Sequence, residues 1–146
     1  NKNHNYLKEI GANEVISRNE FKILTKPLAK ETWSGCIDTV GGNILSTIIS
    51  QMKYNGTIVN TGLAKSHELN TTVYPFILRN ITLSGIDCVY ANYRKRIAAW
   101  NFLKENVNKK FLKLIKNSSN INNLKIISNK IIEGKIMGRT VIKIDK

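Results

Sequence analysis

The chain has 146 residues, of which 42% are apolar, so it is large enough for one domain with a hydrophobic core. No apolar run approaches the ~18 residues that span a bilayer, and the first ten residues, NKNHNYLKEI, lack the apolar centre of a signal peptide, which argues against a membrane-spanning or secreted protein. The net charge is +13, and residues 92–146 contribute fourteen basic and three acidic side chains to it.

The first third of the chain alternates helical and strand-like patterns. Residues 5–10 place apolar side chains on one helical face, and Gly11 follows as a candidate C-cap. Residues 13–17 are predicted as a short strand, and residues 19–33 as an irregular or briefly helical segment. Residues 35–40, GCIDTV, are almost continuously apolar, which is typical of a strand covered on both faces.

The rest of the chain continues this alternation. Apolar residues at helical spacing predict helices within 43–52 and 92–107, with a shorter helical turn within 71–80. The strands predicted here lie within 54–63, 81–87 and 140–144, and one or two further helices precede the last of them. Alternating strands and helices predict a mostly parallel α/β sheet, in which ligands bind beyond the carboxyl ends of the strands.

Two acidic side chains follow isoleucines near predicted strand ends. Asp38 and Asp87 occupy equivalent positions, and two such acids could act as a general acid/base pair. The alternative is that each carboxylate caps or bridges a neighbouring loop, and the pattern does not separate the two interpretations. Arg18 follows the first predicted strand, where it could bind a phosphate or ribose group, whereas His4 and His67 lie among polar residues and are interpreted as surface side chains.

Four segments make the prediction more specific when they are taken in order: YLKEIGANEVISRNEF, KPLAKETWSGCIDTVGG, TVYPFILRNITLSGIDCV and GRTVIKI. Together they closely resemble the acryloyl-CoA reductase/quinone oxidoreductase family, the zinc-independent members of the medium-chain dehydrogenase/reductase superfamily. The resemblance covers essentially the whole chain. It implies that residues 1–110 are a partial NADP-binding Rossmann domain, a doubly wound parallel sheet without its first two strands. Residues 111–146 would then be a C-terminal segment that returns to a GroES-like catalytic domain.

The same resemblance implies the cofactor NADPH and the residues that hold it. Its pyrophosphate would bind a glycine-rich loop upstream of residue 1, at a helix N-terminus. Arg18 would bind the 2′-phosphate and so select NADPH over NADH. The other implied residues are, for the cofactor, Gly41, Leu63, Ile77, Cys88 and Arg139 and, on the substrate side, Ile86 and Asp87.

The implied reaction transfers a hydride from NADPH to the β-carbon of an electron-poor C=C bond, in acryloyl-CoA or a similar enoyl or quinone acceptor. A proton then reaches the α-carbon. No metal is expected, and the two cysteines, Cys36 and Cys88, fit neither a zinc pattern nor a disulfide framework. The catalytic residues are not assigned, because most belong to the catalytic domain. The resemblance also implies a homodimeric parent protein, and the cysteine usage indicates the cytoplasm.

The chain departs from the family pattern at three places. Cys88 stands where Ser is more usual, Lys65 and Ser66 stand where two glycines are preferred, and residues 116–123 look like a longer, looser connection. The first departure bears on a hydrogen bond to cofactor or substrate, and the second on the local turn.

The basic second half allows a competing interpretation, a nucleotide- or nucleic-acid-binding module. However, 58 of the 146 residues are Lys, Asn or Ile, whose codons are AT-rich, and compositional drift would produce the same charge. A third possibility is a truncated gene product without a function of its own. Because a sheet without its two central strands has an open apolar edge, we expect the chain alone to fold poorly and to lack reductase activity.

Overall fold

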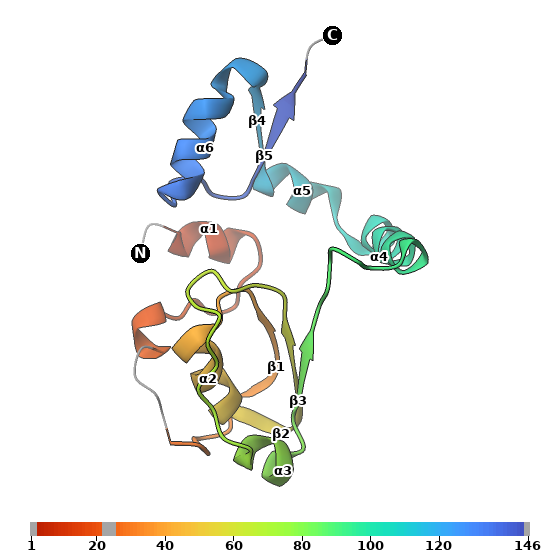
Figure 1. Cartoon of the computed structure of the whole chain (residues 1–146). Helices are drawn as coiled ribbons and strands as arrows, with labels where there is room; N and C mark the ends of the chain where they lie inside the picture. Colours follow the sequence, from red (N-terminus) through yellow and green to blue (C-terminus); the bar gives the residue numbers. More distant parts are fainter. Residues whose placement is uncertain (1–2, 22–25, 145–146) are drawn as a thin grey trace. The chain divides into compact units, whose positions relative to one another are not determined.

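The computed structural model describes residues 3–21 and 26–144 (Figure 1). It confirms the predicted α/β class, since helices alternate with strands and the paired strands run parallel. The chain forms two compact units, one of Ile16–Asn92 and one that combines Asn1–Val15 with Tyr93–Lys146. The predicted division at residue 110 concerns the domains of the longer parent protein and stays a prediction.

A three-stranded parallel sheet forms the centre of the first unit. Its strands are β1 (Trp33–Asp38), β2 (Met52–Asn60) and β3 (Thr82–Gly85), in the spatial order β1-β2-β3. They correspond to the second, third and fourth predicted strands, which are confirmed. The pair Asn55 and Gly56 lies inside β2, where Asn55 has a φ of 61°.

Helix α2 (Gly42–Ser50) connects β1 to β2 and covers one face of this sheet (Figure 1). The side chains of Cys36, Ile58 and Leu83, which are aligned across the three strands, face the same core. The buried core residues are Leu45, Ile49, Met52, Ile58 and Ile81, and each contributes about 2 kcal/mol to folding through the apolar surface it buries.

The opposite face of the sheet is open in this unit. Side chains alternate along a strand, so Ile37 points away from the core that Cys36 faces, and Ile37 is 78% exposed. The expectation that β1 is covered on both faces is therefore wrong for this unit. The physical reason is that its covering elements, α2 and α3 (Tyr74–Arg79), pack around a single core on one face.

Helix α3 (Tyr74–Arg79) begins with Pro75 in its first turn, a position where the missing N–H costs no hydrogen bond. It confirms the predicted helical turn in this segment.

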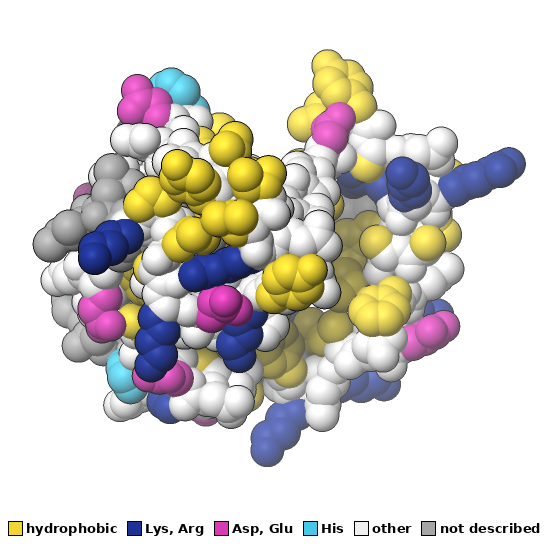
Figure 2. Space-filling model, turned by 90° about the horizontal axis from the view of Figure 1, so that it is seen from below, with side chains coloured by type: hydrophobic (Ala, Val, Ile, Leu, Met, Phe, Trp, Pro, Cys, Tyr) yellow, Lys and Arg dark blue, Asp and Glu magenta, His cyan; other side chains and the backbone are white. Residues whose placement is uncertain are grey.

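Exposed hydrophobic side chains gather on the surface of the unit that Figure 2 views from below. The exposed apolar residues of α3 and its N-cap are Val73, Tyr74, Ile77 and Leu78.

The second unit contains a smaller, two-stranded parallel sheet. Strand β4 (Lys116–Asn120) pairs with β5 (Arg139–Lys143), and α6 (Leu124–Ile132) connects them after a short 3-10 turn, η2 (Ile121–Asn123). Strand β5 and the helices confirm the predicted final strand and the predicted helices before it. The unit also contains α1 (His4–Glu9), which ends where Gly11 was expected to cap it, with a φ of 109°.

Two sequence predictions of secondary structure are wrong. Residues 13–17 form no strand, because a strand needs a neighbour to hydrogen-bond and these residues have none among the described strands. Instead, the carbonyl of Ser17 accepts a hydrogen bond from Glu20 N and begins the 3-10 helix η1 (Arg18–Phe21). Residues 116–123 are not a loose connection, since their first five residues form β4.

The long predicted helix is α4 (Tyr93–Asn106), followed by α5 (Lys109–Ile115), whose first turn is capped by the side chain of Asn108. The predicted apolar face of α4 is present but uncovered, with Trp100 64% exposed. Over the described ranges, no helix is long and apolar enough to cross a membrane.

Candidate functional site

The carboxyl ends of the three strands in the first unit meet at one edge of the sheet. The register pairs Asp38 of β1 with Asn60 of β2, and Asn60 with Gly85 of β3. In open parallel sheets this edge is where ligands bind. Two adjoining cavities of about 420 and 380 Å³ open here, and both are lined by Asn60, Gly62, Leu63 and Gly85.

The loops that follow β1 and β2 lie directly against each other at this edge. Ala64 N donates a hydrogen bond to the Thr39 carbonyl at 3.2 Å, and Lys65 N donates one to the Val40 carbonyl at 2.9 Å. A further parallel bridge joins Gly41 to Ser66. The two loops therefore form a short ladder that extends the sheet beyond its last regular residues. We call them the glycine loops, because the first contains Gly41 and the second contains Gly62.

Glycines permit this close approach. Gly41 has a φ of 71°, and a Cβ on it would overlap the Ser66 carbonyl oxygen. A Cβ on Gly62 would lie 2.6 Å from the Thr39 carbonyl oxygen. Glycine is thus needed at both positions because the two loops lie too close together for a side chain. The contact of Gly41 with the cofactor, which the resemblance implies, stays a prediction.

Gly85 differs from the two loop glycines. A Cβ built on it would meet no atom within 4 Å, although Gly85 lines both cavities. The absence of a side chain here leaves the cavities open without being required by the packing of the protein itself.

Both acidic residues singled out in the sequence hold loops. The Asp38 side chain, in a residue only 5% exposed, accepts hydrogen bonds from Gly41 N at 3.0 Å and from Asn60 Nδ2 at 2.6 Å. Asp87 Oδ1 accepts from the backbone N–H groups of Val89 and Tyr90, at 2.9 and 3.0 Å. The loop-capping alternative describes both carboxylates, and an acid/base pair gains no support from these contacts.

Four of the predicted site residues come together at this edge. Gly41, Leu63, Ile86 and Asp87 line one or both cavities, with Leu63 65% exposed. Cys88 is exposed and follows Asp87 directly in the chain.

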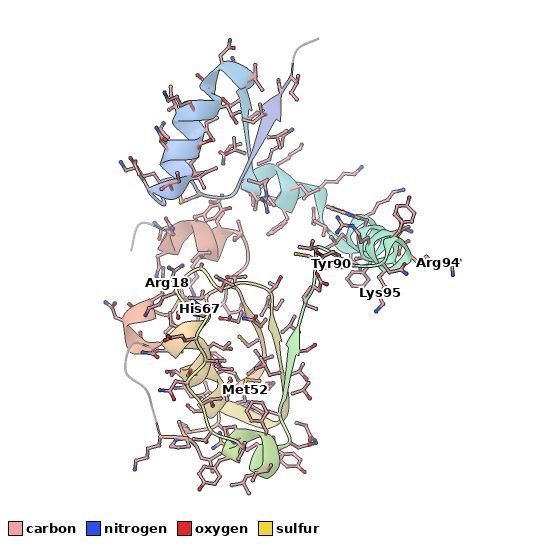
Figure 3. All side chains as sticks on the ribbon, viewed as in Figure 1. Arg18, Met52, His67, Tyr90, Arg94 and Lys95 are labelled. Carbon is pink, nitrogen blue, oxygen red and sulfur yellow. The ribbon has the colours of Figure 1, made fainter. Side chains whose placement is uncertain are left out.

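Three predicted residues lie elsewhere. Ile77 is on α3, whose Arg79 contacts the backbone where β2 begins, so it is near the amino-terminal ends of the strands and lines neither cavity. Arg139 begins β5 in the second unit and lines a cavity of that unit. Arg18 is exposed at the start of η1, which packs against α2, and Figure 3 shows it toward the same end of the first unit as His67.

Several cavity residues were missed by sequence reasoning. Asn60, Ser66 and His67 line the cavities, but Asn60 was not singled out and His67 was interpreted only as a surface side chain. The usable signal for Asn60 was a polar residue directly after the apolar pair Ile58 and Val59, toward the carboxyl end of a predicted parallel strand. No comparable signal marked His67, because its loop reaches the cavity only through contacts with the Gly41 loop.

Cys36 lies on β1 close to this edge and is half-buried. Burial raises the pKa of its thiol, and the negative charge of Asp38 raises the pKa further. Since the thiolate is the nucleophilic form, Cys36 is poorly suited to nucleophilic catalysis. No cluster of three or more His, Cys, Asp or Glu side chains that could hold a metal ion occurs within residues 3–21 and 26–144.

A parallel α/β sheet with glycine loops and cavities at its carboxyl edge defines the class of nucleotide-binding domains. The family model described as zinc-binding dehydrogenase matches residues 1–105, and the chain belongs to this family, within the medium-chain dehydrogenase/reductase superfamily. Together with the relatives given next, this match confirms the resemblance stated from the sequence, and the expected absence of a metal stays a prediction.

Individual relatives support the same assignment. AcuI of Escherichia coli, a probable acrylyl-CoA reductase, is 38% identical over 142 residues, 97% of this chain and 44% of that protein. The yhdH oxidoreductase of Salmonella enterica, crystallised with NADP, is 38% identical and superposes with a TM-score of 0.95 over 99% of this chain and 44% of its own. YhfP of Bacillus subtilis, crystallised with NAD, is 34% identical, with a TM-score of 0.93 over 99% of this chain and 44% of its own. The chain thus spans less than half the length of these relatives.

Proposed function

We propose that this chain is the nucleotide-binding part of an NADPH-dependent reductase that reduces an activated carbon–carbon double bond. The observation that supports it most is the pair of cavities at the carboxyl edge of the parallel sheet, bordered by two contacting glycine loops. NADPH supplies the hydride when it is bound, and the protein binds and orients it. The complete reaction belongs to a protein more than twice as long as this chain.

The residues at the edge fit a flat, partly apolar ligand. The open space at Gly85 would accept a ring close to the backbone, and the exposed side chains of Leu63 and Ile86 would hold its apolar faces. The Asn60 side chain and the loop around Ser66 supply polar groups at the same cavity. We therefore assign the nicotinamide and ribose part of NADPH to this edge.

Arg18 is our candidate for the 2′-phosphate, which distinguishes NADPH from NADH. A guanidinium forms charge-assisted and often bidentate hydrogen bonds with phosphate, and Arg18 is exposed at the end of the unit toward which the site opens. This choice of NADPH agrees with the NADP bound in the Salmonella relative, whereas the Bacillus relative was crystallised with NAD.

For the acceptor we propose an enoyl thioester such as acryloyl-CoA, because AcuI of E. coli is named as an acrylyl-CoA reductase. A quinone-like acceptor is the second candidate, since YhfP is provisionally named as a quinone oxidoreductase. We also propose that the parent protein is cytoplasmic and homodimeric.

The proposal is tested by titrating the chain with NADPH and measuring binding by calorimetry and by the fluorescence of Trp33 and Trp100. Gly85→Val should weaken NADPH binding at least about tenfold, because its side chain would fill the cavity. Ser84→Val is the matched control on the other face of β3 and should leave binding unchanged.

A second pair of measurements addresses the nucleotide. Arg18→Ala should reduce the preference for NADPH over NADH by about tenfold, the effect of losing one charge-assisted contact. Salt-dependent binding of DNA or RNA without any binding of NADPH would contradict the proposal and favour the nucleic-acid alternative.

A further inference from the structure

A single pair of side chains reaches into both glycine loops. Asn60 Nδ2 donates hydrogen bonds to the Asp38 carboxylate at 2.6 Å and to the Gly62 carbonyl at 3.1 Å. The same Asp38 oxygen, Oδ2, accepts from Gly41 N at 3.0 Å. Asp38 and Asn60 are also partners in the strand register, at the last positions of β1 and β2.

These bonds connect backbone groups that are distant in the sequence, since Gly41 belongs to the loop after β1 and Gly62 to the loop after β2. In addition, the Asp38 carbonyl accepts a hydrogen bond from Thr61 N at 2.9 Å. Because Asp38 is almost completely buried, hydrogen bonds to its charged carboxylate are shielded from water and stronger than exposed ones. Neither side chain belongs to the apolar core under α2.

We propose that Asp38 and Asn60 act as positioning residues that hold the two glycine loops in their relative position, so that the nucleotide cavity is formed before the ligand arrives. The inference rests on the proposed function, since the cavity it shapes is the one assigned to NADPH. Preformed loops improve affinity because no free energy of binding is lost in ordering them. Asp38 therefore serves the site through Gly41 and Asn60, without itself acting as an acid or base.

Amide hydrogen exchange of the intact chain, in sucrose to favour the compact state, measures loop position directly. Asn60→Ala removes both donated bonds, and exchange at Gly41 and Lys65 should become about tenfold faster than in the unmodified chain. The amide of the core residue Ile58 serves as the reference. The ratio of its exchange rate to the rate of global unfolding should be the same in Asn60→Ala and in the unmodified chain.

The matched control is Gln51→Ala, which removes a side-chain hydrogen bond of the same kind, from Trp33 Nε1 at 2.9 Å, away from the cavities. It should leave exchange at Gly41 and Lys65 unchanged. A further comparison uses Asp38→Ala and Asp38→Asn. The asparagine retains one oxygen that can accept from both donors, so it should restore most of the protection that alanine loses.

NADPH affinity provides the functional readout. Asn60→Ala and Asp38→Ala should each weaken binding about tenfold, and Gln51→Ala should not. Unchanged exchange at Gly41 and Lys65 in Asn60→Ala, or equal effects of Gln51→Ala, would overturn the inference. If the unmodified chain binds no NADPH, the proposed function fails, while the exchange measurements still decide whether the pair positions the loops.

Discussion

At the residue scale, Arg79 connects three segments of the first unit. Its guanidinium donates to the carbonyls of Ser50, Met52 and Ala29, at 2.8, 3.1 and 2.6 Å, and lies 3.5 Å from a Glu31 carboxylate oxygen. The side chain is only 13% exposed. One residue of α3 thus ties the end of α2, the start of β2 and the segment before β1 together.

Replacing Arg79 by Leu should lower the free energy of unfolding by about 3 kcal/mol, because three carbonyl groups lose their donor in a partly buried place. Arg79→Lys should have an intermediate effect, since a single ammonium cannot reproduce the planar fork of donors. Urea unfolding followed by circular dichroism measures both. Equal stability of the Lys variant and the unmodified chain would show that charge alone matters here.

Thr47 is an exception to the rule that buried polar groups find partners. It is fully buried on α2, and its hydroxyl has no hydrogen-bond partner among the described residues. The neighbouring Ser46 hydroxyl, by contrast, donates to the Gly42 carbonyl at 3.2 Å.

Thr47→Val should raise the free energy of unfolding by about 1 kcal/mol, because it removes an unsatisfied hydroxyl while keeping the shape of the side chain. Ser46→Ala is the control and should lower stability slightly, since it removes a bond that is made. Thermal unfolding of the two variants distinguishes them, and a destabilised Thr47→Val would mean that the hydroxyl has a partner.

At the element scale, the site is built where loops continue the pairing of strands. Residues after β1 and β2 keep a parallel ladder although they no longer belong to regular strands. The glycine stretch after β1, which contains Gly41 and Gly42, serves this contact. Its position between β1 and α2 was predictable, whereas its partner, the loop around Ser66, was not.

Gly62→Ala should therefore destabilise the first unit by about 2 kcal/mol, because the new methyl group would overlap the Thr39 backbone. Gly85→Ala is the matched control: it meets no atom, and stability should change by less than about 0.5 kcal/mol. Chemical denaturation with matched probes checks both. A tolerated alanine at Gly62 would indicate that the loops can separate at little cost.

The same scale explains which elements the sequence predicted. The strands and helices around the core were recognisable because their apolar residues repeat at periods set by local geometry. Residues 13–17 have strand-like composition but no pairing strand within residues 3–21 and 26–144, so composition alone predicted the wrong structure here. Strand β4, with the polar sequence KNSSN, has low intrinsic strand preference and forms because β5 pairs with it.

At the scale of the whole molecule, each unit buries few side chains. The apolar core of the first unit consists of Leu45, Ile49, Met52, Ile58 and Ile81, and α4, α5 and α6 of the second unit contain no buried residue. The uncovered faces include Ile37 in the sheet and Trp100 on α4. Few buried contacts then oppose the conformational entropy of 146 residues.

We therefore expect the isolated chain to be only marginally stable and to have no reductase activity. Its urea transition should be broad, with a free energy of unfolding below about 5 kcal/mol, and a dye that binds exposed apolar surface should bind the native chain. A sharp transition at higher stability, together with turnover of NADPH and an enoyl thioester, would contradict this expectation.

The sequence by itself determined the α/β class, the order of most elements and the family, because these depend on local periodicity and on motifs that are contiguous in the chain. Only the tertiary structure decided which polar groups shape the site. The bond between Asp38 and Asn60 joins residues 22 positions apart, and the contact between Gly41 and Ser66 depends on a loop without a pattern of its own. Such contacts arise from strand register, which no local signal in either loop specifies.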